Sequence, residues 1–257
     1  MYLEMFNLKG RTAVVTGGGQ GIGFACAQAL GEAGAKVVVA ELLADRVEKA
    51  VAELKALGVD AYGAELDVTD SKAVADLAAK VAADHGGASI LVNNAGIAFS
   101  DVKAEDTSDE HWAKHFRVNV DGVFYCCREF GKLMLAAGKG SVVNIGSMSG
   151  FIVNKPQPQS FYNASKAAVH HLTKSLACEW GARGVRVNSV APTYIETPLT
   201  LFGAQNQEML KTWLDMTPMG RMGQPHEIAS TVLFLASDAS SLLTGSIIAA
   251  DGGYTCW

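Results

Sequence analysis

Residues 12–23 read TAVVTGGGQGIG, a short β-branched run that leads directly into a glycine-rich turn. The next residues, FACAQALGEAG at 24–34, have the composition of a helix. Glycines in such a turn let the backbone bend tightly and approach a phosphate group, which the free N–H groups at a helix N-terminus attract. The GxxxGxG spacing differs from the commoner GxGxxG pattern, but its place between a strand and a helix predicts a dinucleotide-binding turn. The residues predicted to contact the dinucleotide here are Gly17, Gln20, Gly21, Ile22 and Gly23.

The same alternation of short apolar runs and longer helical segments continues along the chain. Apolar residues recur at helical spacing in 44–58 and in 71–86, and Asp70 or Ser71 is expected to cap the second helix. Strands separated by helices pair in parallel, and near-continuous apolar strands fit a sheet covered on both faces. Because no linker or change of composition divides residues 1–257, we expect one α/β domain with a doubly wound, Rossmann-type, seven-stranded parallel sheet and helices on both faces. The predicted strands cover 12–17, 36–41, 61–68, 89–96, 141–147, 185–192 and 246–253.

The composition narrows the class of protein. Of the 257 residues 49% are hydrophobic and 18% are charged, with a net charge of −5, so the chain can bury a large core. Lys and Arg are scattered along the sequence, which argues against a nucleic-acid surface. The first residues, MYLEMFNLKG, lack the pattern of a signal peptide, and no apolar run approaches the ~20 residues of a membrane span. We therefore expect a cytoplasmic protein without nucleic-acid or membrane partners.

Cysteine and histidine give no indication of a metal site. The five cysteines form no CxxC pair, and their odd number predicts free thiols that are buried or at an interface. His111 and His115 have the spacing of zinc ligands, but no Glu or Cys completes a site. We expect the two histidines to lie on a solvated helix face, and no metal to be bound.

Ligands of a doubly wound sheet bind beyond the carboxyl ends of its strands, so the residues at these ends are candidates. Glu41 ends the second run, where its carboxylate can accept hydrogen bonds from both ribose hydroxyls of adenosine and would repel a 2′-phosphate. No Arg or Lys is adjacent to Glu41 in the sequence, so NAD is favoured over NADP. Further predicted cofactor contacts are Leu42, Asp67, Val68, Asn93, Asn94, Ala95 and Gly96. The two asparagines are also expected to tie adjacent strand ends together.

A second group of polar residues gathers after the fifth strand. Ser147 closes that run, and Tyr162 and Lys166 lie four positions apart in the next helix, so the three can converge on one crevice. At this point the sequence resembles the short-chain dehydrogenase/reductase family. The matching pieces are TGGGQGIG, Asp67, NNAG, Asn119 in RVNV, Ser147, YNASK and PTYIETP. The resemblance implies a nicotinamide cofactor and a catalytic tetrad of Asn119, Ser147, Tyr162 and Lys166, in which Asn119 would hold a water that links Lys166 to solvent.

The chemistry of this group can be argued from its residue types. Oxidation of an alcohol needs a base that takes the hydroxyl proton, and a tyrosine pKa of about 10 is too high for efficient work near neutral pH. Lowering it by about three units requires about 4 kcal/mol, and an ammonium at ~4 Å supplies about that much at an effective dielectric of 20. Lys166 is therefore expected to lower the pKa of Tyr162, with the positive nicotinamide ring adding to the effect. Ser147 is expected to hydrogen-bond the substrate oxygen.

The segment PTYIETP at 192–198 departs from the family, which usually has Pro-Gly at its start. Thr193 lacks the backbone freedom of glycine, so this loop is expected to follow a slightly different path. Pro192, Ile195 and Thr197 are still expected to contact the nicotinamide end of the cofactor, together with Tyr162 and Lys166.

Substrate selection is expected from two loops, 148–161 and 193–220. Several hydrogen-bonding side chains in the first loop suit a polyhydroxylated substrate, and GSMSGFIVNKPQ, TWLDMTPMGRMGQP and DGGYTCW resemble bacterial galactitol and related polyol dehydrogenases of this family. The predicted activity is NAD-dependent interconversion of a secondary alcohol and a ketone, on a sugar alcohol or vicinal diol. The predicted substrate contacts are Ser147, Ser149, Asn154, Gln157, Tyr162 and Tyr194.

Other interpretations stay open. Apolar residues of the second loop, with Trp213, could form an apolar lid over the substrate of a broader ketone or 3-oxoacyl reductase. A catalytically silent dinucleotide-binding scaffold is disfavoured by the intact tetrad. Helices around 110–137 and 162–181 carry apolar residues on more than one face, including Phe124, and the family resemblance implies a homotetramer formed through them.

Overall fold

The computed structural model describes residues 1–257, except for the side chain of Phe202. Seven strands form one parallel sheet in the order β3-β2-β1-β4-β5-β6-β7, which confirms the predicted fold class. The strands are β1 (Thr12–Thr16), β2 (Lys36–Glu41), β3 (Ala61–Glu65), β4 (Ile90–Asn93), β5 (Gly140–Ile145), β6 (Val185–Pro192) and β7 (Ile247–Ala250). The helices are α1 (Gly21–Glu32), α2 (Ala44–Ala56), α3 (Ser71–His85), α4 (Asp109–Phe116), α5 (Gly122–Ala137), α6 (Ser160–Trp180), α7 (Pro198–Gly203), α8 (Gln207–Asp215) and α9 (Pro225–Ala236). Asp70 caps α3 by accepting hydrogen bonds from the backbone N–H groups of Lys72 and Ala73.

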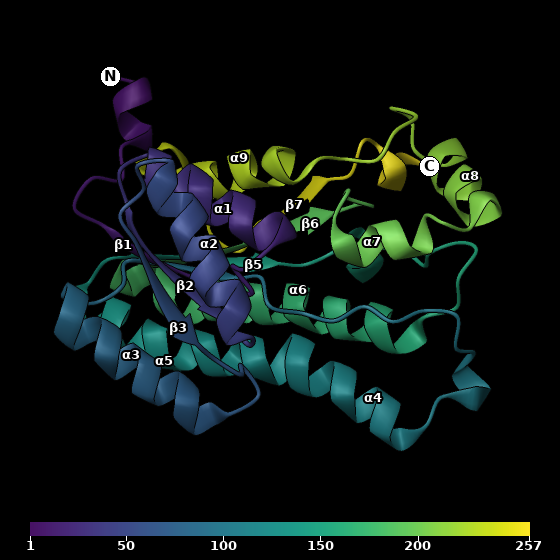
Figure 1. The fold of residues 1–257 in the computed structure, drawn as a ribbon, viewed down its shortest axis with the longest axis horizontal. Helices are drawn as coiled ribbons and strands as arrows, with labels where there is room; N and C mark the ends of the chain where they lie inside the picture. Colours follow the sequence, from purple (N-terminus) through teal and green to yellow (C-terminus); the bar gives the residue numbers. More distant parts are fainter.

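Helices cover both faces of the sheet (Figure 1). The helices α1, α2 and α9 share one buried apolar cluster with the sheet, and α3, α5 and α6 share another. Val14 and Val15 are neighbours on β1, yet they belong to different clusters because successive side chains of a strand point to opposite faces. The strands β1, β4 and β5 are therefore buried along their whole length and are mostly apolar, as expected for a sheet covered on both faces.

Five strands end earlier than predicted: β1 by one residue, β5 by two, and β3, β4 and β7 by three. Strand pairing explains the ends of the two edge strands, β3 and β7. β3 is an edge strand that pairs only with β2, and its last residue, Glu65, lies opposite Glu41, the last residue of β2. β7 is the other edge strand and stops at Ala250, opposite Pro192 at the end of β6. An edge strand cannot continue past its one neighbour, so residues 66–68 and 251–253 leave the sheet.

The chain order reverses between β1 and β4, and a crevice opens there at the carboxyl ends of the strands. Asn94 fixes this point, since its side-chain amide donates to the carbonyls of Thr16 at 3.1 Å and Gly17 at 2.9 Å. Asn93 joins β4 to β5 through a 2.8 Å hydrogen bond to Asn144. The two asparagines thus tie adjacent strand ends together, as predicted.

The helical region 109–137 is interrupted by one turn of π-helix, Arg117–Asp121, between α4 and α5. The histidines of α4 do not form the solvated face that the sequence suggested. His115 is fully buried and packs against Phe161, with ring centroids 4.4 Å apart, because α4 lies against the start of α6.

The cysteines and the helix lengths complete the comparison with the sequence. All five cysteines are free, and Cys178 and Cys256 are exposed whereas the other three are buried. None of the described helices combines the length and the apolar character needed to cross a membrane.

Candidate active site

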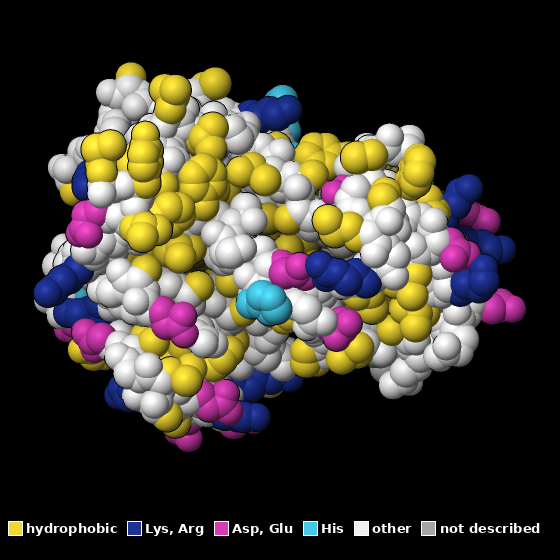
Figure 2. All heavy atoms as spheres, turned by 90° about the horizontal axis from the view of Figure 1, so that it is seen from above, with side chains coloured by type: hydrophobic (Ala, Val, Ile, Leu, Met, Phe, Trp, Pro, Cys, Tyr) yellow, Lys and Arg dark blue, Asp and Glu magenta, His cyan; other side chains and the backbone are white. Residues whose placement is uncertain are grey.

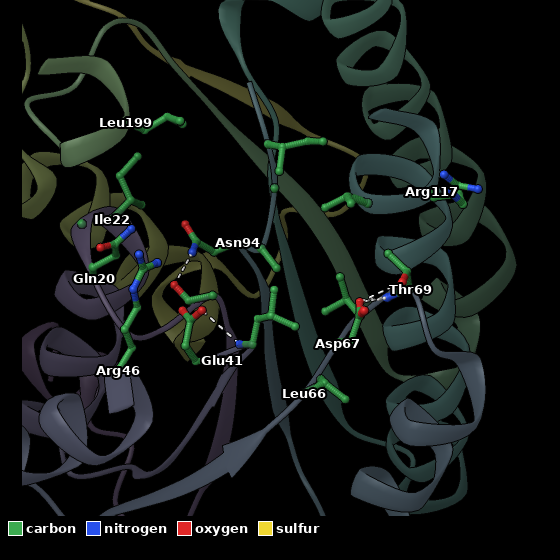
Figure 3. A pocket seen from close by; sticks show the side chains of 18 of the residues that line it. Gln20, Ile22, Glu41, Arg46, Leu66, Asp67, Thr69, Asn94, Arg117 and Leu199 are labelled. Atoms are coloured by element: carbon green, nitrogen blue, oxygen red, sulfur yellow. Dashed lines mark hydrogen bonds between the residues drawn. The ribbon is translucent and has the colours of Figure 1, made fainter. Parts of the chain in front are cut away.

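The largest cavity lies over the switch point and has a volume of 920 Å³. Figure 3 shows Gln20, Glu41 and Arg46 on one wall, and Asp67, Thr69 and Arg117 on the opposite wall. A smaller cavity of 140 Å³ shares residues with it and continues toward the end of β5. Together they form an elongated site along the strand ends.

The N-terminus of α1 fits a pyrophosphate. Gln20, the N-cap residue, makes no side-chain capping hydrogen bond, and the first turn of α1 carries no acidic side chain. The first N–H groups of α1 therefore have no side-chain cap, and an anion is attracted to them. Gly17 and Gly21 have φ angles of +61° and +56°, which only glycine adopts readily, so the turn brings the backbone of α1 up to the cavity.

Glu41 is held rigidly in the adenosine part of this site. Its side chain accepts hydrogen bonds from the N–H groups of Gly19 at 3.2 Å and Leu42 at 3.0 Å, and it is only 8% exposed. The structure also places Arg46 at this wall, from the first turn of α2 (Figure 3). Arg46 is five positions after Glu41, so this cation is not among the sequence neighbours of Glu41 and was not predicted.

Most of the predicted cofactor residues line the two cavities. Those in the large cavity are Gly17, Gln20, Gly21, Ile22, Glu41, Leu42, Asp67, Val68, Asn94, Ala95, Gly96 and Thr197, and the smaller one adds Tyr162, Lys166, Pro192 and Ile195. Gly23 and Asn93 line neither cavity. A side chain at Gly23 would overlap the carbonyl of Gly17, and Asn93 is buried between strands. Both residues therefore affect the shape of the site without lining it.

Lys166 and Tyr162 lie one turn apart on α6 and face the crevice. The Lys166 ammonium donates to the carbonyl of Ile145 at 2.9 Å and lies 5.7 Å from the centre of the Tyr162 ring. Burial lowers the pKa of Lys166 to about 8, because the charged ammonium is removed from water.

The expected lowering of the Tyr162 pKa by Lys166 is not found in the protein alone. Burial raises the pKa of the phenol, and contact with Ser147 only partly opposes this. The carbonyl of Ile145 binds the Lys166 ammonium, and burial disfavours the phenolate before any positive ligand is bound.

The Ser147 hydroxyl is oriented by the short turn that follows β5. Ser147 precedes a 3-10 turn, Met148–Gly150, and its oxygen accepts a hydrogen bond from the N–H of Ser149 at 3.1 Å. The two serine hydroxyls are also 3.0 Å apart. The Ser147 oxygen is therefore fixed beside Tyr162 at the end of the sheet.

Asn119 sits in the π-helical turn, a feature often found at functional sites. Its carbonyl oxygen accepts from the N–H of Ile97 at 2.9 Å, and its amide donates to the carbonyl of Ile97 at 2.9 Å and to Ser165 at 3.1 Å. The side chain thus joins the segment after β4 to α6, the helix that carries Tyr162 and Lys166. Its polar atoms are occupied by these contacts.

A further cavity of 420 Å³ opens beside Ser147 and Tyr162 and shares these residues and Thr193 with the 140 Å³ cavity. All six predicted substrate residues line it: Ser147, Ser149, Asn154, Gln157, Tyr162 and Tyr194. α8 closes one side, with Met209 and Trp213 buried toward the cavity. Figure 2 shows acidic and basic side chains gathered at the end of the molecule that carries α8, as expected for a helix with one buried and one solvated face.

Trp213 is not part of a purely apolar lid. Its indole N–H donates to the side-chain oxygen of Gln157 at 3.1 Å, and its ring stacks on Tyr194 at 3.9 Å. Trp213 and Gln157 are 56 positions apart in the sequence, and no local pattern brings them together.

Thr193 causes no backbone strain where the family usually has glycine. Its φ angle lies outside the left-handed region, and its N–H donates to the carbonyl of Ala250 at 3.3 Å. The following loop is held to the segment before α9 by hydrogen bonds from Glu196 and Gly223, both 2.9 Å long.

Comparisons with known proteins agree with this geometry. Residues 17–255 match the family described as Enoyl-(Acyl carrier protein) reductase. A galactitol 2-dehydrogenase from Rhizobium johnstonii is 52% identical, covering 100% of this chain and 99% of the relative, and an L-tagatose-forming galactitol 2-dehydrogenase from Cereibacter sphaeroides is 49% identical with the same coverage.

Solved structures show the same fold over the whole chain. The crystal structure of gox2181 is 50% identical with a TM-score of 0.99, and each chain is covered to 100%. A gluconate 5-dehydrogenase from Burkholderia cenocepacia J2315, in complex with NADP and tartrate, is 33% identical with a TM-score of 0.95, again with full coverage of both chains. The sheet order, the glycine turn, the Ser147–Tyr162–Lys166 crevice and these relatives lead to one conclusion: the chain belongs to the short-chain dehydrogenase/reductase family.

Proposed function

We propose that this protein is an NAD-dependent polyol dehydrogenase that oxidises a secondary hydroxyl of a sugar alcohol or vicinal diol to a ketone. The observation that carries the proposal is the 420 Å³ cavity, in which polar side chains from 148–161 and 193–215 surround Ser147 and Tyr162. The two galactitol 2-dehydrogenases support the substrate class. We further propose that residues 1–257 act as one domain and that the protein works in the cytoplasm.

In the proposed mechanism, Tyr162 takes the proton of the substrate hydroxyl. Ser147 donates a hydrogen bond to the same oxygen and holds it beside Tyr162. Lys166 keeps a positive charge near the phenolate, and Asn119 positions α6 against the segment after β4. When bound along the strand ends between Gly21 and Lys166, an oxidised nicotinamide dinucleotide would supply the hydride acceptor and a positive charge that favours the phenolate.

NAD is proposed as the cofactor because Glu41 presents a fixed carboxylate where a 2′-phosphate would lie. Arg46 on the same wall and the NADP-bound gluconate 5-dehydrogenase make NADP the competing possibility. The test is kcat/KM for both cofactors in the parent, in Glu41→Ala and, as a matched control on the same wall, in Arg46→Ala. We expect the parent to prefer NAD, Glu41→Ala to lose about tenfold or more of that preference, and Arg46→Ala to keep it. A parent that prefers NADP contradicts the assignment.

The activity itself is tested by following NADH absorbance with sugar alcohols, simple secondary alcohols and hydroxyacids. Tyr162→Phe is expected to lower kcat by about a thousandfold, since proton transfer by a positioned group is worth about 10²–10⁴. NAD affinity, measured by fluorescence titration, is expected to change less than about threefold, because the phenol oxygen adds little to ground-state binding. Full turnover by this variant would refute the role of Tyr162, and absence of activity on every polyol would refute the substrate class.

A second candidate is a broader ketone or 3-oxoacyl reductase. It is favoured by the apolar part of the same cavity, where Met148, Leu199 and Met209 lie beside the polar residues. Reduction of small ketones and acyl thioesters with NADH, at rates above those for ketoses, would favour this candidate. A catalytically silent scaffold is disfavoured, because it has no need for Tyr162 and Lys166 in one crevice.

A homotetramer is proposed from the family and from the exposed side of α5. Phe124, a large apolar side chain, is 40% exposed there. Light scattering after gel filtration tests the assembly, and Phe124→Asp is expected to shift it toward smaller species.

A further inference from the structure

The substrate cavity contains a chain of hydrogen bonds whose direction is fixed at one end. An indole N–H can only donate, so Trp213 must donate to the side-chain oxygen of Gln157. This leaves the Gln157 amide nitrogen as the donor to the Tyr194 hydroxyl, at 3.1 Å. The orientation of Gln157 is therefore set by Trp213 rather than by solvent.

Tyr194 is the point where two donors meet. Its hydroxyl accepts from Gln157 and also from the amide nitrogen of Asn154, again at 3.1 Å. The Tyr194 ring is stacked on Trp213 at an interplanar angle of 10°, so it has little freedom to move. The nitrogen is thus the atom of the Asn154 amide that contacts Tyr194, and the amide oxygen is left for another partner.

The chain ends at an acceptor without a partner. The amide oxygen of Asn154 makes no hydrogen bond, although the residue is only 5% exposed and the oxygen is shielded from solvent. A buried acceptor left unpaired costs about 1–3 kcal/mol, so a structure that keeps one in place is expected to use it. Asn154 lines the same cavity as Ser147 and Tyr162.

We propose that the amide oxygen of Asn154 accepts a hydrogen bond from a substrate hydroxyl other than the one that is oxidised. Tyr194, Gln157 and Trp213 are positioning residues that hold this oxygen in place. The inference rests on the proposed function, and it adds the group that distinguishes a polyol from a simple alcohol. A site built to pair with a hydroxyl rejects an analogue without it far more strongly than an apolar pocket rejects a change of size.

The experiment compares galactitol with 2-hexanol, which has the same number of carbons and a single hydroxyl. The ratio of their kcat/KM values is measured with NAD in the parent and in Asn154→Leu, which keeps the branching and the number of heavy atoms of the side chain and removes its polar atoms. We expect a ratio of at least a hundredfold in the parent and a fall of tenfold or more in the variant. A variant that keeps the parent ratio overturns the inference while leaving the polyol activity, and so the proposed function, intact.

A second pair of variants tests the positioning residues. Trp213→Phe keeps an aromatic ring on Tyr194 and removes the indole N–H, so the ratio is expected to fall about threefold through KM. Trp257→Phe is the matched control, because it removes an indole hydrogen bond of the same kind, to the Met216 carbonyl at 2.9 Å, outside the cavity. It is expected to keep the parent ratio.

The double variant Asn154→Leu with Trp213→Phe separates positioning from simple damage. If Trp213 acts through Asn154, the double variant has the ratio of Asn154→Leu alone, since residues in one hydrogen-bonded network are not additive. If the losses of the kcat/KM ratio in the two single variants multiply in the double variant, the positioning role of Trp213 is overturned. If Asn154→Leu does not fold, as judged by thermal unfolding, the parent decides the matter: equal kcat/KM for galactitol and 2-hexanol overturns the inference.

Discussion

The cofactor end and the substrate end of the crevice are built in different ways. At the cofactor end, the segments that directly follow β1, β2 and β4 lie in close contact with one another, and this contact between backbone segments sets the shape of the site. The substrate end is made of long polar side chains from two loops, and they are held by hydrogen bonds to one another. The first is therefore expected to tolerate almost no added volume, and the second to respond mainly to lost polar groups.

Gly23→Ala is expected to have the largest effect. The added methyl group would overlap the carbonyl of Gly17 and the side-chain amide of Asn94, which join α1, β1 and β4. Neither neighbour can move without breaking the switch point, so we expect a loss of about 3 kcal/mol in the free energy of unfolding and no measurable NAD binding. Chemical denaturation and fluorescence titration check this, with Gly181→Ala as the control, because Gly181 has a φ angle of −55° and a methyl group there would meet only Thr244, at 4.0 Å. Normal NAD affinity in Gly23→Ala would contradict the claim that the cofactor end tolerates almost no added volume.

Lys166→Met is expected to abolish turnover and to stabilise the protein. The pKa of Lys166 falls from 10.5 to about 8 in the folded state, so below pH 8 the fold carries the cost of a buried ammonium. Between pH 8 and 10.5 the unfolded chain binds more protons than the folded one, and this cost disappears as the pH rises. The variant is therefore expected to be about 3 kcal/mol more stable at pH 7 and equal to the parent near pH 10.5. Denaturation at both pH values measures this, and a variant less stable at pH 7 contradicts it.

The sequence predicts the cofactor end of the crevice better than the substrate end. Glycines at 17, 21 and 23, Glu41 and the Asn93–Asn94 pair act at strand ends within short segments, so their spacing alone indicates their place. The contact of Trp213 with Gln157 depends on how α8 folds back over residues 148–161, which no local pattern encodes. The buried His115 has the same origin, since it is placed by the packing of α4 against the start of α6.

His170→Leu is expected to reduce the loss of stability that the protein suffers as the pH falls. His170 packs between Gly146 and Gly150, is 5% exposed, and burial lowers its pKa to about 4. As the pH falls from 6.5 to 4, the unfolded chain takes up a proton that the folded one does not, so the parent loses stability. We expect the loss between pH 7 and 4 to be about 2 kcal/mol smaller in the variant. Equal losses in parent and variant would show that His170 does not carry this sensitivity.

Thr193→Val is expected to have the smallest effect on stability, and it tests whether the Thr193 hydroxyl serves the fold or the substrate. The Thr193 hydroxyl is buried without a hydrogen-bond partner at the junction of the two cavities, and its backbone needs no glycine. Valine has nearly the same shape without the polar group, so the free energy of unfolding should rise by about 1 kcal/mol. If the hydroxyl serves only the fold, kcat/KM for galactitol stays at the parent value. If it pairs with substrate, kcat/KM falls despite the gain in stability, and Thr193 joins Asn154 as a polar group kept unpaired for a ligand. Denaturation and steady-state kinetics on the same preparation distinguish the two, and a loss of stability would show that the hydroxyl has a partner in the folded protein.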